Sequence, residues 1–138
     1  MNQVAIFWPV IALVTLTFAV GGLTLNARLR AAFAKKVGPK DFRYGESDRV
    51  PPDVALFNRN YMNLLELPVL FYVVCLCLYE TKHVSIFEVT LAWLFVATRV
   101  IHSGIHLSSN NVFHRMLAFN AGSFVLILLW VLFALAIV

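Results

Sequence analysis

Four long apolar runs constrain this chain more than any other feature. They cover residues 4–25, 61–79, 84–107 and 116–138. A membrane-spanning helix needs roughly 20 mostly apolar residues, so each run is long enough to cross a bilayer. A membrane barrel strand instead alternates in polarity, whereas the run FVLILLWVLFALAIV is apolar on every side. Because helices satisfy their own backbone groups in lipid, we predict an all-α integral membrane protein built as a four-transmembrane-helix bundle.

The composition leaves little chain for a second domain. Of the 138 residues, 61% are hydrophobic and 13% are charged, which is far from the balance of a soluble domain. We therefore predict a single membrane domain over residues 1–138, with helices at about 4–29, 56–79, 84–107 and 113–138. The first run is longer than a secretory signal and lacks a preceding basic residue, so we expect it to be a retained helix.

The largest polar segment, about residues 30–55, joins the first two predicted helices and is strongly basic. With the end of the first helix it contains Arg28, Arg30, Lys35, Lys36, Lys40, Arg43 and Arg49. The positive-inside rule predicts that this loop is cytoplasmic and that both termini lie on the opposite side. The net charge of +4 comes mainly from the loop, which favours contact with membrane lipids and not with nucleic acid.

Cysteine and histidine spacing gives no metal site. Cys75 and Cys77 are two apart and fall on different faces of a helix, which suits neither a disulfide framework nor zinc. HSGIH places His102 and His106 one turn apart, but no HExxH pattern and no third ligand accompany them. We predict no metal.

Polar residues enter the second apolar run in the stretch NRNYMNLLELP. At 100° per residue, Arg59, Asn63 and Glu66 share an arc of about 60° on one helix. A charge at a helix centre costs on the order of 2.5 to 3.5 kcal/mol on insertion scales, and such residues usually face a bundle interior or a wet cavity. This stripe therefore predicts a functional site, although tying helices together is an alternative.

The third predicted helix carries a matching stripe of Arg99, His102 and His106. Because the two helices run in opposite directions, depth along the membrane pairs Arg59 with His106, Asn63 with His102 and Glu66 with Arg99. We predict that Glu66 and Arg99 pair directly at the deepest level.

Further cations reach the same end of the bundle. Arg28 and Arg30 end the first helix, and Arg115 begins the fourth. Glu66 can neutralise only one arginine, so this end should form a cationic pocket. Such a pocket favours an anionic ligand, with Glu66 free to meet an ammonium group.

These residues resemble the pattern of the MAPEG family, the membrane-associated proteins of eicosanoid and glutathione metabolism. RNYMNLLELP is similar to the family's second-helix signature, and RVIHSGIH is similar to its third-helix pattern. Arg115 stands where a microsomal transferase has its next arginine, and NARLRAAF resembles the basic end of the first helix. The likeness extends over nearly the whole chain.

The resemblance implies a homotrimer that binds glutathione between neighbouring protomers and acts as a transferase or peroxidase on a lipophilic substrate. The implied glutathione site comprises Arg28 or Arg30, Arg59, Asn63, Glu66, Arg99, His102 and Arg115. Within it, Arg115 would stabilise the thiolate, which is the nucleophile. His106 stands where the family's transferases commonly have tyrosine, and it would donate a hydrogen bond to the thiolate.

Two other functions are open at this stage. The first is a non-catalytic or differently specialised MAPEG-like trimer that binds an anionic lipid or metabolite in the same cavity. The second is a transport role, which needs a polar track across the whole membrane, whereas the outer half offers little beyond Glu88.

Overall fold

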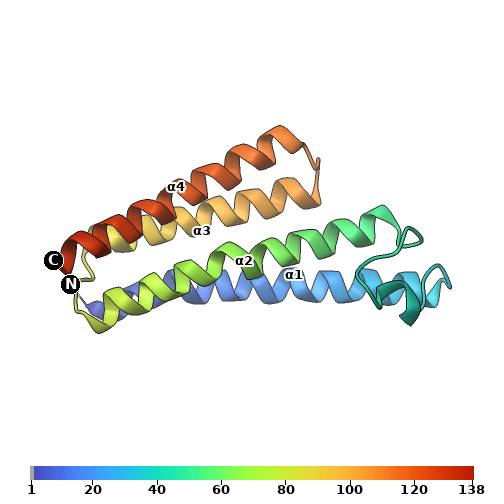
Figure 1. The fold of residues 1–138 in the computed structure, drawn as a ribbon, viewed down its shortest axis with the longest axis horizontal. Helices are drawn as coiled ribbons and strands as arrows, with labels where there is room; N and C mark the ends of the chain where they lie inside the picture. Colours follow the sequence, from blue (N-terminus) through green and yellow to red (C-terminus); the bar gives the residue numbers. More distant parts are fainter. Residues whose placement is uncertain (1) are drawn as a thin grey trace.

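The computed structural model describes residues 2–138 as four long helices (Figure 1). They are α1 (Phe7–Phe33), α2 (Pro52–Glu80), α3 (Ile86–Leu107) and α4 (Val112–Ala136), with short 3₁₀ turns η1 (Gln3–Ile6) and η2 (Pro39–Phe42). All four long helices have the length and the apolar composition needed to cross a membrane. The predicted all-α membrane class is therefore confirmed.

Two helix ends differ from the predicted ones by four residues, and the other ends differ by three or fewer. α1 continues past residue 29 to Phe33, because the sequence RLRAAF consists mainly of strong helix formers. It stops before Lys35, whose φ of 55° is left-handed. α2 begins at Pro52 instead of residue 56, because proline is well suited to the first position of a helix. α2 then runs through Pro68 to Glu80 as one helix.

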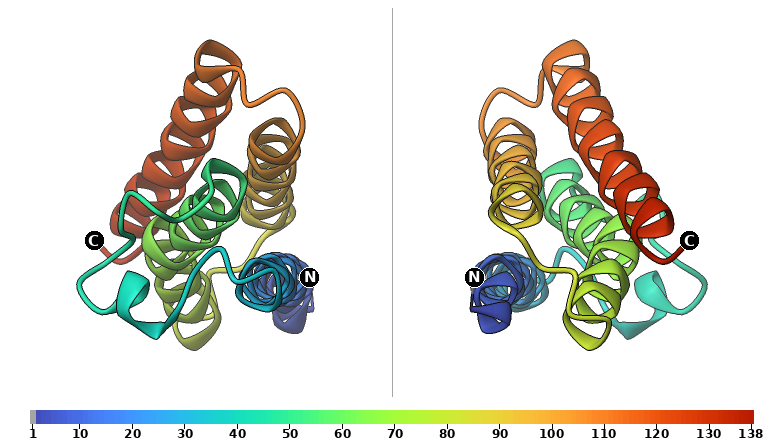
Figure 2. Two further views of the ribbon diagram at one scale, coloured as in Figure 1. Left: turned by 90° about the vertical axis from the view of Figure 1, so that its right-hand side faces the viewer. Right: turned by 90° about the vertical axis from the view of Figure 1, so that its left-hand side faces the viewer.

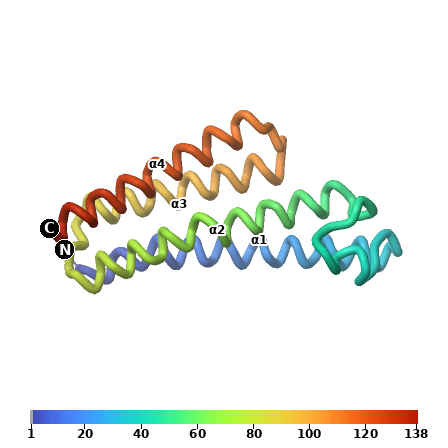
Figure 3. Tube along the Cα trace, viewed as in Figure 1, coloured from blue at the N-terminus to red at the C-terminus, as the bar shows by residue number. Residues whose placement is uncertain are grey.

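The helices run up and down along one long axis, and α2 packs against the other three (Figures 1 and 2). Both chain ends lie at the same end of the bundle, on opposite sides of it, and the basic segment between α1 and α2 lies at the other end (Figures 2 and 3). At that end α1 and α2 extend past α3 and α4 (Figure 1). The link between α3 and α4 is therefore set back from the basic segment.

The core is apolar and includes buried residues from all four long helices. Phe71 of α2 stacks on Phe95 of α3 with ring centroids 4.7 Å apart, and Phe7 packs on Tyr79 at 4.8 Å. In lipid these contacts stabilise through close packing and not through exclusion of water. The side chain of Gln3 also bonds the backbone N–H and C=O of Val84, at 3.0 and 3.1 Å, which ties η1 to the α2–α3 link.

The basic segment is folded against the ends of α1 and α2. A small cluster of Ala31, Val37, Val50 and Val54 holds it there. Asp41 organises the turn, because its carboxylate accepts hydrogen bonds from the Gly38 N–H at 2.8 Å and the Ser47 hydroxyl at 2.7 Å. The segment therefore has fixed local structure.

The stability of this segment should depend on pH. Hydrogen bonds from the backbone of Gly38 and from Ser47 lower the pKa of Asp41 below its ordinary value. Asp41 thus contributes stability above an unfolded pKa of about 3.9, and this contribution is lost as pH falls through the lower folded value. Hydrogen exchange of residues 37–50, corrected for intrinsic pH effects, should be slower in the wild type than in Asp41→Asn at neutral pH. The two proteins should converge in acid. A difference that grows in acid would contradict the assignment.

Candidate functional site

The contact between α2 and α3 at the loop end is set by Asn60. Its side chain is fully buried and accepts a hydrogen bond from the Ser103 hydroxyl of α3 at 3.1 Å. The sequence predicts how α2 and α3 align by their depth in the membrane. The Asn60–Ser103 pair differs from that alignment by about 3 Å along the helix axes. The residue that faces α3 is nevertheless Asn60, which the sequence analysis did not single out.

The predicted stripe on α2 does not face α3 as a unit. The buried face of α2 includes Asn60, Leu64 and Pro68, and this rotation turns Arg59 and Glu66 outward, where both are exposed. Asn63 is partly buried beside α4.

The predicted ion pair between Glu66 and Arg99 is wrong. Within residues 2–138 the one ion pair joins Arg28 and Glu46 at 3.8 Å. Arg99 is almost fully buried, and it turns toward α4 instead of α2. Its Nη2 donates to the Phe119 carbonyl at 3.1 Å, and its guanidinium lies over the rings of Phe95 and Phe119 at 5.3 and 5.1 Å.

Gly122 of α4 explains why the Arg99 side chain can turn toward α4. A Cβ atom there would come closer than 3.0 Å to Nη2 of Arg99 and to Oγ1 of Thr98. α4 can therefore approach α3 at this level, with the guanidinium between them, only because position 122 has no side chain. Arg99 Nε and Nη1 have no partner among the described residues.

Three predicted site residues do come together on a surface formed by α2, α3 and α4. Asn63 of α2, His102 of α3 and Arg115 of α4 line a cleft of about 280 Å³, which is completed by Val112, Met116 and Phe119. We call it the Arg115 cleft. His102 contacts the ring of Phe119 at 6.0 Å and that of His106 at 5.7 Å. His106 itself is buried behind His102 and does not line the cleft.

The short link before α4 positions Arg115. Asn110 has a φ of 47°, a left-handed conformation that asparagine tolerates, and its Oδ1 accepts a hydrogen bond from Arg115 Nη1 at 2.6 Å. Asn111 then caps α4 by accepting a hydrogen bond from the His114 N–H at 3.1 Å. One asparagine thus turns the chain and holds the guanidinium, and the next starts the helix.

An apolar groove lies next to the Arg115 cleft along α2 and α4, toward the middle of the bundle. It has a volume of about 420 Å³ and lies between α2 and α4, lined by Leu67, Leu70, Ser123, Leu126, Ile127, Trp130, Val131 and Ala134. Leu67 and Ser123 each lie one helical turn past a cleft residue, Asn63 and Phe119 respectively. The polar cleft and the apolar groove therefore follow one another along the same pair of helices.

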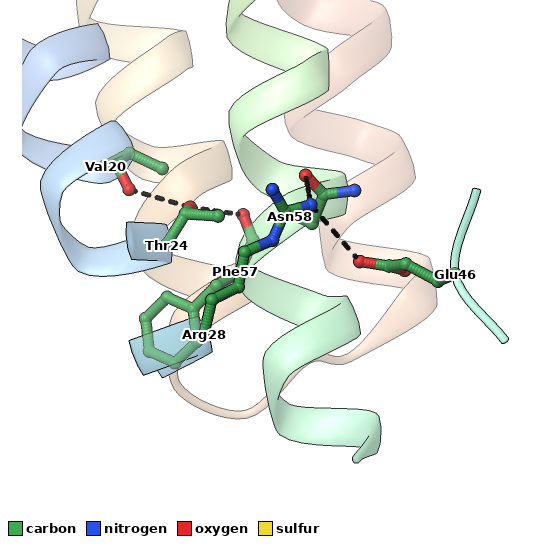
Figure 4. Close-up of polar contacts among 6 residues, drawn as sticks. All are labelled: Val20, Thr24, Arg28, Glu46, Phe57 and Asn58. Atoms are coloured by element: carbon green, nitrogen blue, oxygen red, sulfur yellow. Dashed lines mark hydrogen bonds and ion pairs between the residues drawn. The ribbon is translucent and has the colours of Figure 1, made fainter. Parts of the chain in front are cut away.

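Arg28 and Arg30 lie on different surfaces. Arg28 lines a groove of about 560 Å³ between α1 and α2, which also contains Asn58 and Tyr61. Its Nη2 donates to Asn58 Oδ1 at 2.9 Å, and it also faces Glu46, as Figure 4 shows. Arg30 lines a separate groove of about 500 Å³. Two helical residues that are two apart point in nearly opposite directions, so only one of them can meet a given ligand.

A comparison with protein families decides the assignment. The model of the MAPEG family matches residues 6–135. The chain belongs to the MAPEG family. No significant match to it was found among curated proteins or among solved structures. The resemblance inferred from the sequence motifs is thereby confirmed.

Several residues of the MAPEG site region carried no signal that the sequence analysis used. Asn110, Asn111, Phe119 and Gly122 were not among the predicted site residues. A glycine or an asparagine at a helix boundary could have suggested close approach or capping. Nothing in the pattern indicated that Gly122 would accommodate Arg99.

Proposed function

We propose that this MAPEG chain is a glutathione-dependent transferase or peroxidase that acts on lipophilic substrates. One observation carries the proposal: residues of the Arg115 cleft and of the apolar groove follow one another, one helical turn apart, along α2 and α4. A polar thiol and a lipid-soluble molecule could therefore lie next to each other, with Arg115 on the polar side. The indole Nε1 of Trp130, buried without a partner among residues 2–138, offers a donor to the lipophilic substrate.

The charges around the cleft fit a zwitterionic peptide with an excess of carboxylate. Arg59 is exposed, Arg115 is half-buried, and neither has an acidic partner within 4.0 Å among residues 2–138. Each could hold a carboxylate or a thiolate. Glu66 is also exposed and has no ion-pair partner within the described chain, so it remains available to an ammonium group.

The reaction follows from thiolate chemistry. The cation of Arg115 lowers the pKa of a bound thiol, and the resulting thiolate forms a bond to an electrophilic carbon while the leaving group departs. With a hydroperoxide, the thiolate attacks the terminal oxygen, and the alcohol leaves with a proton. A second glutathione then reduces the sulfenic acid to disulfide and water.

The same proposal includes a homotrimer whose sites are shared between protomers. At about 280 Å³ the Arg115 cleft is smaller than the roughly 300–1,000 Å³ of typical ligand pockets. Arg28, the other candidate for carboxylate binding, lines a different groove of the same protomer. A neighbour that presents its Arg28 groove to this cleft would complete the site, as heterologous contacts in a closed ring allow.

Mixed trimers test the proposal. Arg28→Ala and Arg115→Ala should each lose most conjugation of glutathione to a dinitrohalobenzene. Coexpression in equal amounts should restore activity in about a quarter of the sites. Each shared site needs an intact Arg28 from one protomer and an intact Arg115 from its neighbour, and random mixing provides each with a chance of about one half. Recovery should disappear when the two purified variants are assayed together without subunit exchange. Full activity in both single variants would refute the proposed site, and no recovery on coexpression would refute sharing between protomers.

A further inference from the structure

The end of α1 and the folded basic segment line another open hollow, away from the Arg115 cleft. It has a volume of about 410 Å³, and its charged lining consists of Lys35, Lys40, Arg49 and Asp41. The three cations outnumber the one carboxylate. We call it the basic hollow.

The cations of the basic hollow form no ion pair with a carboxylate of residues 2–138, although the charge of Arg49 acts on Asp41. Asp41 uses its carboxylate on the Gly38 N–H and the Ser47 hydroxyl. Glu46, another acidic residue of the segment, pairs with Arg28. Within residues 2–138, none of the three cations lies within 4.0 Å of a carboxylate oxygen. An anion from outside could therefore be bound by all of them.

The backbone around the basic hollow is held in place before any ligand arrives. Lys35 occupies the left-handed turn that ends α1, and the N–H groups of Lys35 and Lys36 bond back to the carbonyls of Ala32 and Ala31 at 2.9 and 3.0 Å. Val37 and Val50 pack on the ends of α1 and α2. Preorganisation of this kind reduces the cost of gathering three cations around one ligand.

The position of the basic hollow relative to the membrane suggests the ligand. Counting about 20 residues of hydrocarbon from Phe7, α1 leaves the apolar layer near Asn26, so its last two turns lie at headgroup level. Phe33 and Tyr44 are 84% and 89% exposed there. Exposed aromatic side chains are typical of the membrane interface. Figure 3 shows the segment folded beside this end of α1.

We propose that the basic hollow binds the phosphate of an anionic phospholipid headgroup, held by Lys35, Lys40 and Arg49. A phosphate oxygen can accept hydrogen bonds from all three side chains, and the acyl chains of the same lipid can lie along the apolar surface of α1. The site is independent of glutathione chemistry. It would fix the height of the basic segment at the bilayer surface.

Native mass spectrometry of the full-length protein in non-ionic detergent tests this proposal without an activity assay. With equal amounts of phosphatidylglycerol and phosphatidylcholine, the wild type should bind the anionic lipid preferentially. Arg49→Gln should lower that preference about fivefold, the factor expected for one surface cation near an anionic lipid. The triple change Lys35→Gln, Lys40→Gln and Arg49→Gln should remove the preference.

Lys36→Gln is the matched control. It removes the same charge from the same segment, but Lys36 lines the Arg30 groove and not the basic hollow. Its effect should be less than twofold. If Lys36→Gln and Arg49→Gln lowered the preference for the anionic lipid equally, the segment would attract anionic lipid through its overall charge, without a specific site. Displacement of the bound lipid by an equal concentration of inorganic phosphate would mean that the hollow binds free phosphate, which would overturn the lipid assignment.

Discussion

Arg115→Ala is expected to abolish the ultraviolet absorbance of glutathione thiolate that the wild-type protein should give with saturating glutathione. The guanidinium is half-buried in a cleft next to an apolar groove, where a positive charge stabilises a thiolate more strongly than it does in water. Loss of one such stabilising group should lower kcat by roughly 10² to 10³. Difference spectroscopy and steady-state conjugation on the same preparation measure both effects.

Asn110→Gly refines this prediction. Glycine accepts the φ of 47° at this position, so the chain can still turn, but Arg115 loses its 2.6 Å hydrogen bond. We expect a thiolate signal between those of the wild type and Arg115→Ala. Arg43→Ala, in the exposed part of the basic segment, should leave the signal unchanged. A full thiolate signal in Arg115→Ala would show that another cation activates the thiol.

Gly122→Ala is expected to destabilise the α3–α4 pair by about 1–3 kcal/mol, the usual cost of forcing extra atoms into a packed region. The new methyl group would collide with the Arg99 guanidinium and the Thr98 hydroxyl, neither of which can move away easily. Nη2 of Arg99 is bonded to Phe119, and Oγ1 of Thr98 is bonded to the Phe95 carbonyl at 2.7 Å. Thermal unfolding in detergent measures the loss.

The control for this substitution lies on α3. Gly104→Ala adds the same methyl group where nothing lies within 4 Å, so helix propensity should make it neutral or stabilising by up to about 1 kcal/mol. Arg99→Met combined with Gly122→Ala should recover part of the loss, with a coupling energy of about 0.5–3 kcal/mol. Strict additivity would mean that Arg99 and Gly122 do not compete for the same space.

The four helices could be predicted because their signal is local. An apolar run of sufficient length must become a helix in lipid. The depth of residues along each helix was also predictable, since rise per residue is constant. This is why the register of α2 against α3, seen in the Asn60–Ser103 bond, falls near its expected level.

The rotation of each helix was not predictable in the same way. A polar stripe defines one face of a helix but not the neighbour that this face meets. Arg99 and Glu66 were matched in depth, yet Arg99 faces α4 because α4 provides the Phe119 carbonyl, the Phe119 ring and the space at Gly122. Glu66 had no comparable partner on α3 and is exposed instead.

The sequence indicates that several cations lie at one end of the bundle, but it does not indicate which surface each of them lines. Arg28, Arg30 and Arg115 do lie toward that end, but they line three separate surfaces. Sequence alone contains no information about which surfaces of two copies meet. A site that draws on more than one chain is therefore visible only after each surface has been located.

The unequal lengths of the helices have a consequence for the membrane in which the protein can work. η1 and α1 together span 31 residues, whereas α3 spans 22, or about 33 Å at 1.5 Å per residue. Since α3 is barely longer than a typical hydrocarbon layer, it sets the bilayer thickness that the protein matches without distortion. A thicker bilayer would leave α3 too short. It would also bring the Cα atoms of Arg28 and Arg30 closer to the acyl chains. Hydrophobic mismatch would therefore act first at the α3–α4 link, whose Asn110 accepts the hydrogen bond from Arg115.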